Sequence, residues 1–398
     1  MNEAALYIHF PFCRQKCNYC DFYSITHLDH VGQYLEALKK EIELYRDNSP
    51  FGGLSFSTLF WGGGTPSLLS PTRLAEIIEH LRQGFSFTHS VEMTCEVNPG
   101  TIDRAYLSVL RETGVNRLSI GVQSFIDEEL RTLTRIHSAR QGEQAVTMAQ
   151  EAGFDNIGVD LIFGIHGQSL KSWEHTLRKA VALRPSHISA YGLTIEAGTV
   201  LAQLIESGHV PRCDEELERE LYLLCKKLLN DAGYIHYEIS NYALPGYECR
   251  HNRKYWDGSL YLGFGPSAHS FDGTKRWWNA DDVELYSQKL GRGELPVIEE
   301  EQLSREQRLL ETILLGLRRR EGIDLKAWKQ CAGFDLLQST KLLQPLGGID
   351  SAAQPFADSA SGQFFTLADH HLKLTAQGLL LYDSLCQQLS ASILFAAI

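Results

Sequence analysis

The sequence predicts an α/β protein with parallel strands, followed by a smaller C-terminal α+β module. One observation and a general rule of sheet topology support this fold class. Short apolar runs alternate with segments of helical periodicity along the first two thirds of the 398 residues, giving six strand–helix units. Neighbouring parallel strands need a long crossover, and a helix is the usual one. The pattern alone leaves an open barrel, a closed barrel and a doubly wound sheet as alternatives.

The predicted strands are short runs dominated by apolar and β-branched residues. They lie at Leu6–Phe10, Thr58–Trp61, Val91–Val97, Arg117–Val122, Asn156–Phe163 and His187–Leu193. One intervening helix is predicted at Tyr34–Tyr45 from its periodicity. Another is predicted at Pro71–Leu81, because Ser70 is a favourable N-cap and proline is tolerated at the first helical position.

The chain is expected to have three parts: a strand–helix domain over residues 1–240, an aromatic-rich connecting segment over 241–296, and a C-terminal module over 297–398. The stretch Tyr234–Gly273 is rich in Tyr, Trp, His, Asn and Gly, which predicts a loop-rich surface. The module has a helix–helix–strand–strand–helix pattern similar to a winged helix. Its strand pair is predicted at Phe364–Leu374, Gly347–Gly362 is predicted to be a loop, and Ser390–Ile398 fits no element.

The composition argues against several classes of protein. Lys and Arg total 37 against 49 Asp and Glu, so the formal charge of −12 disfavours a nucleic-acid or anionic-membrane surface. The tight basic run Arg318–Arg320 is interpreted as a solvated helix end. We find neither a signal-peptide pattern nor a membrane-length apolar stretch, so we expect a cytoplasmic protein without an anchor of its own. The nine cysteines indicate thiols or metal ligands instead of a disulfide framework.

Three cysteines lie within eight residues, directly after the first predicted strand. Cys13, Cys17 and Cys20 have the spacing C-x3-C-x2-C. Clustered thiolates select zinc, copper or iron–sulfur centres. Three thiolates on a four-iron cluster leave one iron open to a further ligand, whereas a structural zinc ion needs a fourth ligand, for which Cys95 and Cys249 are candidates.

Polar or glycine residues end several of the predicted strands. In barrels, side chains at the carboxyl ends of the strands converge on one site. The candidates are the run Gly62–Pro66, Glu96, Gln123, Asp160 and Ile162, together with Arg135 from a following loop. Arg135 suits a ligand carboxylate, and the acidic side chains can accept from hydroxyls or an amine. Each of these signals is weak when taken singly.

The segments Tyr7–Cys13 and Cys17–Cys20 resemble the radical S-adenosylmethionine superfamily, in the branch of the oxygen-independent coproporphyrinogen III oxidases and the HemW heme chaperones. This resemblance covers nearly the full length. It implies an incomplete TIM-like (β/α)6 barrel with a small winged-helix-like domain. It also implies that Cys13, Cys17 and Cys20 hold a 4Fe-4S cluster, which an electron donor reduces, and that S-adenosylmethionine binds the open iron.

The same resemblance assigns residues to the adenosylmethionine site. They are Tyr7, Tyr19, Gly63, Gly64, Thr65, Glu96, Gln123, Arg135, Asp160, Ile162 and Thr194. Tyr7 would lie near the cluster and Tyr19 near the adenine. Thr194, at the end of the sixth predicted strand, is the weakest of these assignments.

Three features favour the heme chaperones over the oxidases. Only a few residues precede the first strand, no cysteine follows the triplet directly, and His251-Asn-Arg-Lys-Tyr-Trp256 resembles the HNxxYW motif of the chaperones. Heme needs an axial donor such as His251, and the aromatic residues offer a flat apolar surface. Arg250, Arg253 and Lys254 could pair with propionates, and His269 is a second candidate ligand.

The leading hypothesis is therefore a chaperone that binds heme and passes it to an acceptor, such as a respiratory heme protein. Oxidative decarboxylation of coproporphyrinogen III by a 5′-deoxyadenosyl radical is the alternative, and a structural zinc protein is a third.

Overall fold

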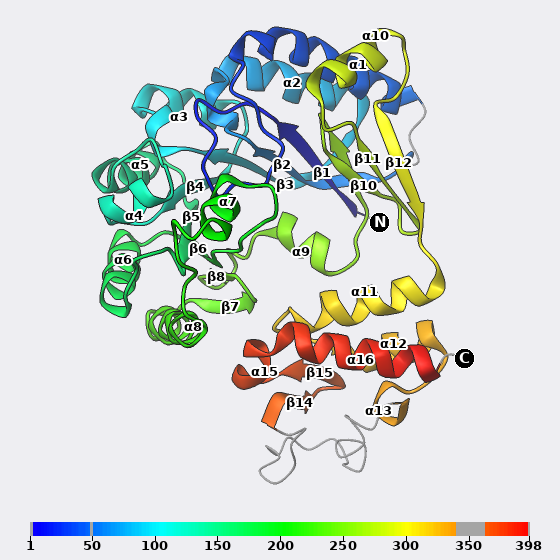
Figure 1. Ribbon diagram of the computed structural model, residues 1–398. Coiled ribbons are helices and arrows are strands. Elements are labelled where there is room, and N and C mark those ends of the chain that lie inside the picture. Colours follow the sequence, from blue (N-terminus) through cyan, green and yellow to red (C-terminus); the bar gives the residue numbers. More distant parts are fainter. Residues whose placement is uncertain (1–2, 48–50, 340–362, 397–398) are drawn as a thin grey trace. The chain divides into compact units, whose positions relative to one another are not determined.

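The computed structural model describes residues 3–47, 51–339 and 363–396, and these form two compact units. The first unit consists of Met1–Ile235, Ser240–Lys254 and Ser259–Glu301, as far as these residues are described. The second consists of His236–Ile239, Tyr255–Gly258 and Gln302–Ile398, with the same restriction. Figure 1 shows the elements of both units along the chain.

Six parallel strands form the centre of the first unit, and they lie side by side in chain order. They are β1 (Glu3–Phe10), β2 (Ser55–Gly63), β3 (Ser86–Val97), β4 (Arg117–Gln123), β5 (Asn156–Phe163) and β6 (His187–Gly192). All six predicted strands are thereby confirmed. The six strand–helix units also confirm the incomplete barrel. The outer strands β1 and β6 do not pair with each other: β1 pairs with β9 (Tyr261–Phe264), and β6 pairs with β8 (Asn241–Ala243).

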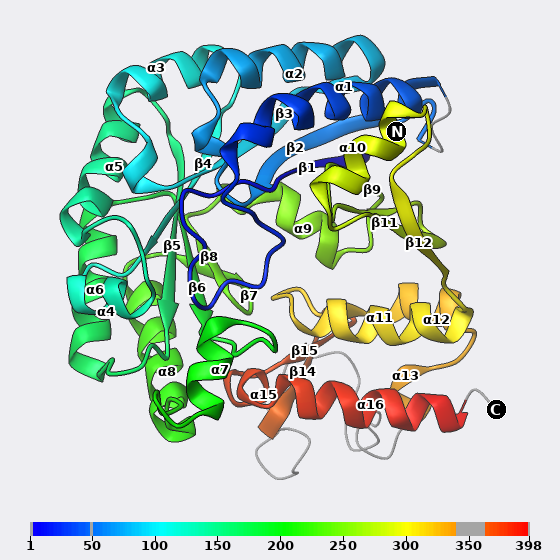
Figure 2. The ribbon, with the colours of Figure 1, turned by 45° about the horizontal axis from the view of Figure 1, so that its top comes forward.

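Helices cover the outer face of this curved sheet (Figure 2). In chain order they are α1 (Val31–Asp47), α2 (Pro71–Gly84), α3 (Arg104–Glu112), α5 (Ala139–Glu151), α6 (Leu170–Leu183) and α8 (Glu215–Asp231). Two short helices, α4 (Asp127–Thr132) and α7 (Val200–Glu206), follow the ends of β4 and β6. The predicted start of α2 is confirmed, since the Ser70 side chain accepts from the backbone N–H of Arg73 at 3.4 Å. The long helices bury one apolar stripe each against the strands.

The central strands are buried over most of their length, which explains their nearly continuous apolar sequences. Trp61 on β2 and Trp173 on α6 are both fully buried in the core of this unit. The Trp173 indole still finds a partner, because Nε1 donates to the carbonyl of Leu221 at 3.0 Å. The sheet is thus a rigid base whose carboxyl ends can hold a site.

The expectation of a loop-rich surface at Tyr234–Gly273 is wrong. This stretch contains β7 (Ile235–Glu238), β8, α9 (Arg250–Trp256), β9 and β10 (His269–Phe271), and β11 (Lys275–Asn279), α10 (Val283–Gly291) and β12 (Val297–Gln302) follow. Several of its aromatic residues are buried with partners; the Tyr234 hydroxyl, for example, donates to the Pro185 carbonyl at 2.6 Å. Aromatic side chains favour strands, and here this preference outweighs the loop-like polarity.

The second unit is a small α+β domain, as predicted. Its antiparallel sheet has the order β13 (Ile323–Asp324), β15 (His371–Leu374), β14 (Phe365–Ala368). Its helices are α11 (Arg305–Leu317), α12 (Leu325–Ala332), α13 (Leu336–Ser339), α15 (Ala376–Leu380) and α16 (Tyr382–Ala396). The tail that the sequence left without an element therefore continues α16 to Ala396. The loop predicted at Gly347–Gly362 lies outside the described residues.

The basic run at the end of α11 is not a simple solvated helix end, so that interpretation is wrong. Arg318 donates twice to Glu238, at 3.0 and 2.7 Å, and the Glu238 carboxylate is fully buried. The Arg318 guanidinium also lies 3.8 Å from the ring centroid of Trp256. Because a buried carboxylate needs a partner, this arginine is a structural residue of the second unit.

Candidate functional site

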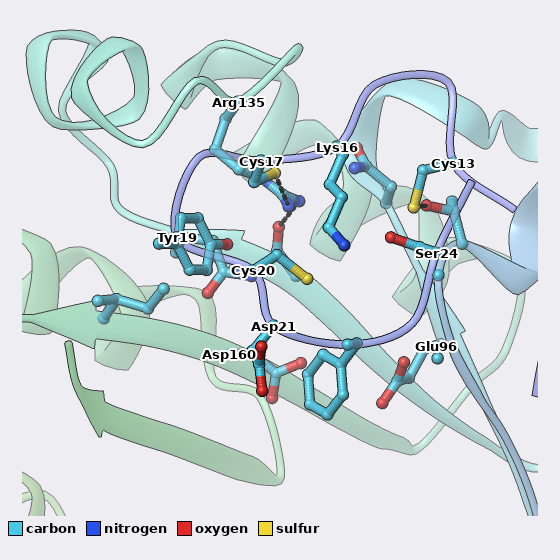
Figure 3. A pocket seen from close by; sticks show the side chains of 18 of the residues that line it. Cys13, Lys16, Cys17, Tyr19, Cys20, Asp21, Ser24, Glu96, Arg135 and Asp160 are labelled. Atoms are coloured by element: carbon cyan, nitrogen blue, oxygen red, sulfur yellow. Dashed lines mark hydrogen bonds between the residues drawn. The ribbon is translucent and has the colours of Figure 1, made fainter. Parts of the chain in front are cut away.

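A cavity of about 520 Å³ lies at the carboxyl ends of β2 to β6 in the first unit, against the loop that follows β1. Except for Tyr7 and His251, all residues predicted for the cluster and cofactor line it. They are Cys13, Cys17, Tyr19, Cys20, Gly63, Gly64, Thr65, Glu96, Gln123, Arg135, Asp160, Ile162 and Thr194. Figure 3 shows the cysteine loop on one side of the cavity, with Glu96 and Asp160 across from it. Sequence-distant residues thus meet at the end of the sheet where barrels carry their sites.

The three cysteines are half-buried, and their loop is closed at its ends by backbone hydrogen bonds. The Cys13 N–H donates to the Ile25 carbonyl at 2.9 Å, and the Ile25 N–H donates to the Pro11 carbonyl at 2.7 Å. Burial raises the pKa values of the Cys13 and Cys20 thiols. Because metals bind the thiolate, metal binding here would release protons.

The middle of the loop is held by Asn18. Its backbone N–H donates to Thr134 Oγ1 and its side-chain amide to the Thr132 carbonyl, both at 2.9 Å. Its own carbonyl accepts from the backbone N–H of Leu201 at 2.8 Å. The loop is therefore anchored to two distant segments of the chain, which fixes where the cysteines between its ends are presented.

The glycine segment at the end of β2 packs directly under the cysteine loop. Gly64 donates its N–H to the Phe10 carbonyl at 2.7 Å, and Thr65 donates to the Phe12 carbonyl at 2.8 Å. A Cβ on Gly64 would lie 2.7 Å from the carbonyl oxygen of Phe12, so no side chain fits. Gly63 has a φ of +105°, which favours glycine. The run thus brings bare backbone close to a ligand.

Two enclosed carboxyl groups face the cavity, Glu96 from β3 and Asp160 from β5, with β4 between these strands. Burial and, second to it, the negative charge of Asp160 raise the pKa of Glu96 to about 8. Burial likewise raises the pKa of Asp160. The Ser119 hydroxyl, which lies 3.2 and 3.0 Å from the two carboxylate oxygens, partly lowers it again by hydrogen bonding. A ligand with hydroxyl groups or a positive charge would favour the ionised forms of both groups.

Arg135 supplies positive charge on the opposite wall. Its Nη1 donates to Cys17 Sγ at 3.4 Å and its Nη2 to the Gly121 carbonyl at 2.8 Å. Among the described residues its buried Nε has no hydrogen-bond partner. Nearby, Gln123 adopts a φ of +66°, a strained conformation of the kind that collects at ligand sites. The arginine can therefore take up a ligand carboxylate.

The donor set fits a four-iron cluster with adenosylmethionine bound beside it. In the described part of the chain, no three His, Cys, Asp or Glu side chains are arranged around a single metal ion. A cluster does not need that arrangement, because each thiolate binds a different iron. Cys95 and Cys249, the candidate fourth ligands of a zinc ion, are buried and do not line the cavity.

Sequence reasoning missed several lining residues. Ser119 could have been found, because Ser119, Gly121 and Gln123 alternate along β4 and so share one face. Lys16, between two cysteines, points into the cavity in Figure 3. Phe22 lies at the mouth with 67% of its surface exposed, and no pattern in the sequence distinguishes it.

The HNxxYW segment forms α9, and its histidine lies elsewhere in the first unit. His251 is only 1% exposed and does not line the cavity. Its Nδ1 is 2.8 Å from the Thr58 hydroxyl, and its ring stacks on Phe60 with centroids 4.9 Å apart. Tyr7 packs beside this pair, at 6.3 Å from the imidazole. Burial lowers the pKa of His251 to about 3, so the imidazole is neutral.

The other heme-directed candidates have protein partners. Arg250 donates to the carbonyl of Ser90 at 2.6 Å, and Lys254 lies 3.8 Å from the Glu3 carboxylate. His269 is exposed, and its ring stacks on Trp278 at 5.4 Å.

Comparison with known proteins defines the class first. The sequence model of the radical SAM superfamily matches residues 7–180, and that of the HemN C-terminal domain matches residues 303–381. The solved coproporphyrinogen III oxidase (HemN) of Escherichia coli superposes with a TM-score of 0.81 at 26% identity, covering 98% of this chain and 90% of that one. The fold is that of a radical SAM protein.

Curated relatives narrow the class. Heme chaperone HemW of Mycobacterium tuberculosis is 37% identical over 324 residues, covering 80% of this chain and 83% of that protein. Heme chaperone HemW of Bacillus subtilis is 35% identical, covering 83% and 87%. Heme chaperone HemW of E. coli is 38% identical, covering 67% and 69%. The chain belongs to the HemW family. Among the described helices, none is both long and apolar enough for a bilayer span.

Proposed function

We propose that this chain is a heme chaperone, which binds heme and transfers it to an acceptor protein. The observation that carries the proposal is the 37% identity, over 83% of its length, to a relative named heme chaperone HemW. The cavity supports it, because its residues suit the cofactors of the superfamily. We propose the cytoplasm as its compartment, where free thiols such as those of this chain stay reduced.

The lining residues then have definite roles. The three cysteines would hold the 4Fe-4S cluster, which when bound supplies an open iron and one electron to S-adenosylmethionine, and a separate electron donor would reduce it. Arg135 would pair with the carboxylate of the cofactor. Glu96 and Asp160 would accept from its hydroxyl and amino groups. Gly63 and Gly64 would let it approach the backbone closely.

His251 is our proposed axial ligand of heme. Its low pKa keeps the imidazole neutral, which is the form that binds iron. Because the side chain is only 1% exposed, ligation requires α9 to move away from the strands. Heme binding is therefore expected to be slower than diffusion and to need this opening.

An anaerobic heme titration of the cluster-loaded protein, followed by absorbance, tests this function. We expect saturable binding near one heme per chain, which His251→Ala weakens and His269→Ala leaves unchanged. Transfer is then measured by mixing the loaded protein with an apo-cytochrome. An absence of heme binding in the wild-type protein would refute the chaperone function, and equal affinities of the two variants would refute the ligand assignment.

A coproporphyrinogen III oxidase is the second candidate, favoured by the TM-score of 0.81 with HemN over 98% of the chain. Its test is turnover of coproporphyrinogen III by the reduced, cluster-loaded protein with S-adenosylmethionine. Turnover comparable with a true oxidase would replace the chaperone proposal. A structural zinc site, the third candidate, predicts zinc instead of iron in anaerobically purified protein.

A further inference from the structure

An aromatic stack inside the first unit connects α9 with the strands that carry the cavity. The His251 imidazole stacks on Phe60 of β2, with centroids 4.9 Å apart and planes inclined by 28°. Phe60 in turn stacks on Tyr7 of β1, at 6.2 Å and 28°. None of the three lines the cavity. The stack is therefore separate from the residues that line the cavity, although the sequence had assigned one of its members, Tyr7, to the cofactor.

The α9 end of the stack is fixed by hydrogen bonds. The imidazole Nδ1 is 2.8 Å from the Thr58 hydroxyl. The buried carboxylate of Glu92 accepts from the backbone N–H groups of Arg250 and His251, at 3.2 and 3.1 Å. The Glu92 side chain, from β3, places its carboxylate at the first N–H groups of α9, where a negative charge is favoured. These contacts hold the ring of His251 in one place relative to β2 and β3.

The other end of the stack reaches the cofactor-binding residues. A Cβ on Gly62 would lie 3.0 Å from Phe60 Cε1, 3.1 Å from Tyr7 Cε2 and 3.3 Å from Glu96 Cδ. The two rings and the Glu96 carboxyl group therefore surround the space that a side chain at Gly62 would fill. Glu96 also accepts a hydrogen bond from the backbone of Gly63, one of the glycines under the cysteine loop.

Close packing of this kind transmits a displacement, because a core without voids cannot absorb it. If the imidazole is removed, Phe60 loses its stacking partner and can move toward the space that it leaves. Gly62 and Glu96 then lose the packing of the Phe60 ring beside them. The contact runs in both directions, so a cofactor that fixes Glu96 also fixes the stack.

We propose that His251 is a positioning residue for the adenosylmethionine site, acting through the rings of Phe60 and Tyr7 on Gly62 and Glu96. This inference rests on the part of the proposed function that assigns adenosylmethionine to the cavity, and it does not depend on heme. It also predicts a consequence for the chaperone. Heme that draws His251 out of the stack weakens cofactor binding, and bound cofactor opposes that movement by the same factor.

The test measures the Kd of S-adenosylmethionine by equilibrium dialysis with cluster-loaded protein. His251→Ala and Phe60→Leu should each raise the Kd about three- to tenfold, which is the size of a lost aromatic contact. His251→Phe, which keeps a ring but cannot bind iron, should restore an affinity near that of the wild type. The double variant of His251→Ala and Phe60→Leu should be no weaker than the weaker single variant, because both act through one contact.

Phe56→Leu is the matched control. Phe56 lies on the same strand as Phe60 and is also buried, but it packs against Phe85 and Phe51 and does not line the cavity. It should leave the Kd unchanged. Hydrogen–deuterium exchange of the peptide with Gly62 and Gly63, in metal-free protein, gives a second readout. Exchange there should be faster in His251→Ala and unchanged in His251→Phe.

Three results would overturn the inference: an unchanged Kd in His251→Ala or Phe60→Leu, a His251→Phe variant as weak as His251→Ala, or an equal loss in Phe56→Leu. The heme titration remains independent of these results. If His251→Ala loses heme binding but keeps the wild-type cofactor Kd, the chaperone function stands and only the positioning role is refuted. If the cofactor Kd values follow the predicted pattern but the wild-type protein binds no heme, the positioning role stands and the chaperone function is refuted.

Discussion

Gly64→Ala places one methyl group where the backbone leaves no room for it. The new Cβ would lie 2.7 Å from the Phe12 carbonyl oxygen and 2.9 Å from the Phe10 carbonyl oxygen, both of them backbone atoms. Relief therefore requires the cysteine loop or the end of β2 to shift. Overpacking of this kind costs about 1–3 kcal/mol. At about 2–4 °C per kcal/mol for domains of 150–250 residues, the melting temperature should fall by about 2–12 °C.

The assay is thermal unfolding of the metal-free protein, followed by iron and cofactor binding after reconstitution. Gly32→Ala is the control, because a Cβ on Gly32, in the first turn of α1, would meet nothing within 4 Å. Gly64→Ala should also bind S-adenosylmethionine more weakly, since the displaced segment is the one that faces the ligand. A variant that melts with the control and binds the cofactor normally would show that the loop and β2 are not held in this contact.

Further predictions concern charge and hydrogen bonding. Folding raises the pKa of Glu96 from 4.5 to about 8, so the stability that its bound proton contributes is fully present below pH 4.5 and is lost as the pH rises through 8. The free energy of urea unfolding of metal-free Glu96→Gln should therefore depend less on pH than that of the wild type. Parallel pH profiles of the two proteins would contradict this. Ser119→Ala removes the hydroxyl beside Asp160, and the cofactor Kd should rise about two- to tenfold in equilibrium dialysis. Arg318→Met takes the guanidinium away from the buried Glu238 carboxylate, and urea unfolding of the second unit should lose about 3–5 kcal/mol, with a smaller loss for Arg318→Lys; a loss below 1 kcal/mol would refute the structural role of Arg318.

Periodicity predicted the strands because parallel strands buried on both faces have almost no polar residues, as in Asn156–Phe163, whose predicted and observed bounds agree. The cavity could be predicted to the same degree, because strand ends of a barrel converge. Polar pairing in three dimensions could not be read from the sequence. Arg318 looks like a surface residue until Glu238 is known to lie against it, and Tyr234 looks loop-like until the Pro185 carbonyl is known to accept from its hydroxyl.

The position of His251 also escapes sequence reasoning. A histidine in a polar motif suggests an accessible ligand, yet Thr58, Glu92 and Phe60 come from two strands far away in the chain and enclose it. Nothing local to the motif indicates these neighbours. The residues of the motif are therefore predictable, whereas their burial requires the fold.

The anchoring of the cysteine loop by Asn18 has a consequence for the order of assembly. Its three hydrogen bonds, to Thr132, Thr134 and Leu201, involve no cysteine. The conformational entropy of the loop is thus lost when the polypeptide folds, so metal binding has to order little more of the loop. Small zinc domains, in contrast, fold only around their ion. The chain can therefore finish folding before the cysteines take up a metal centre.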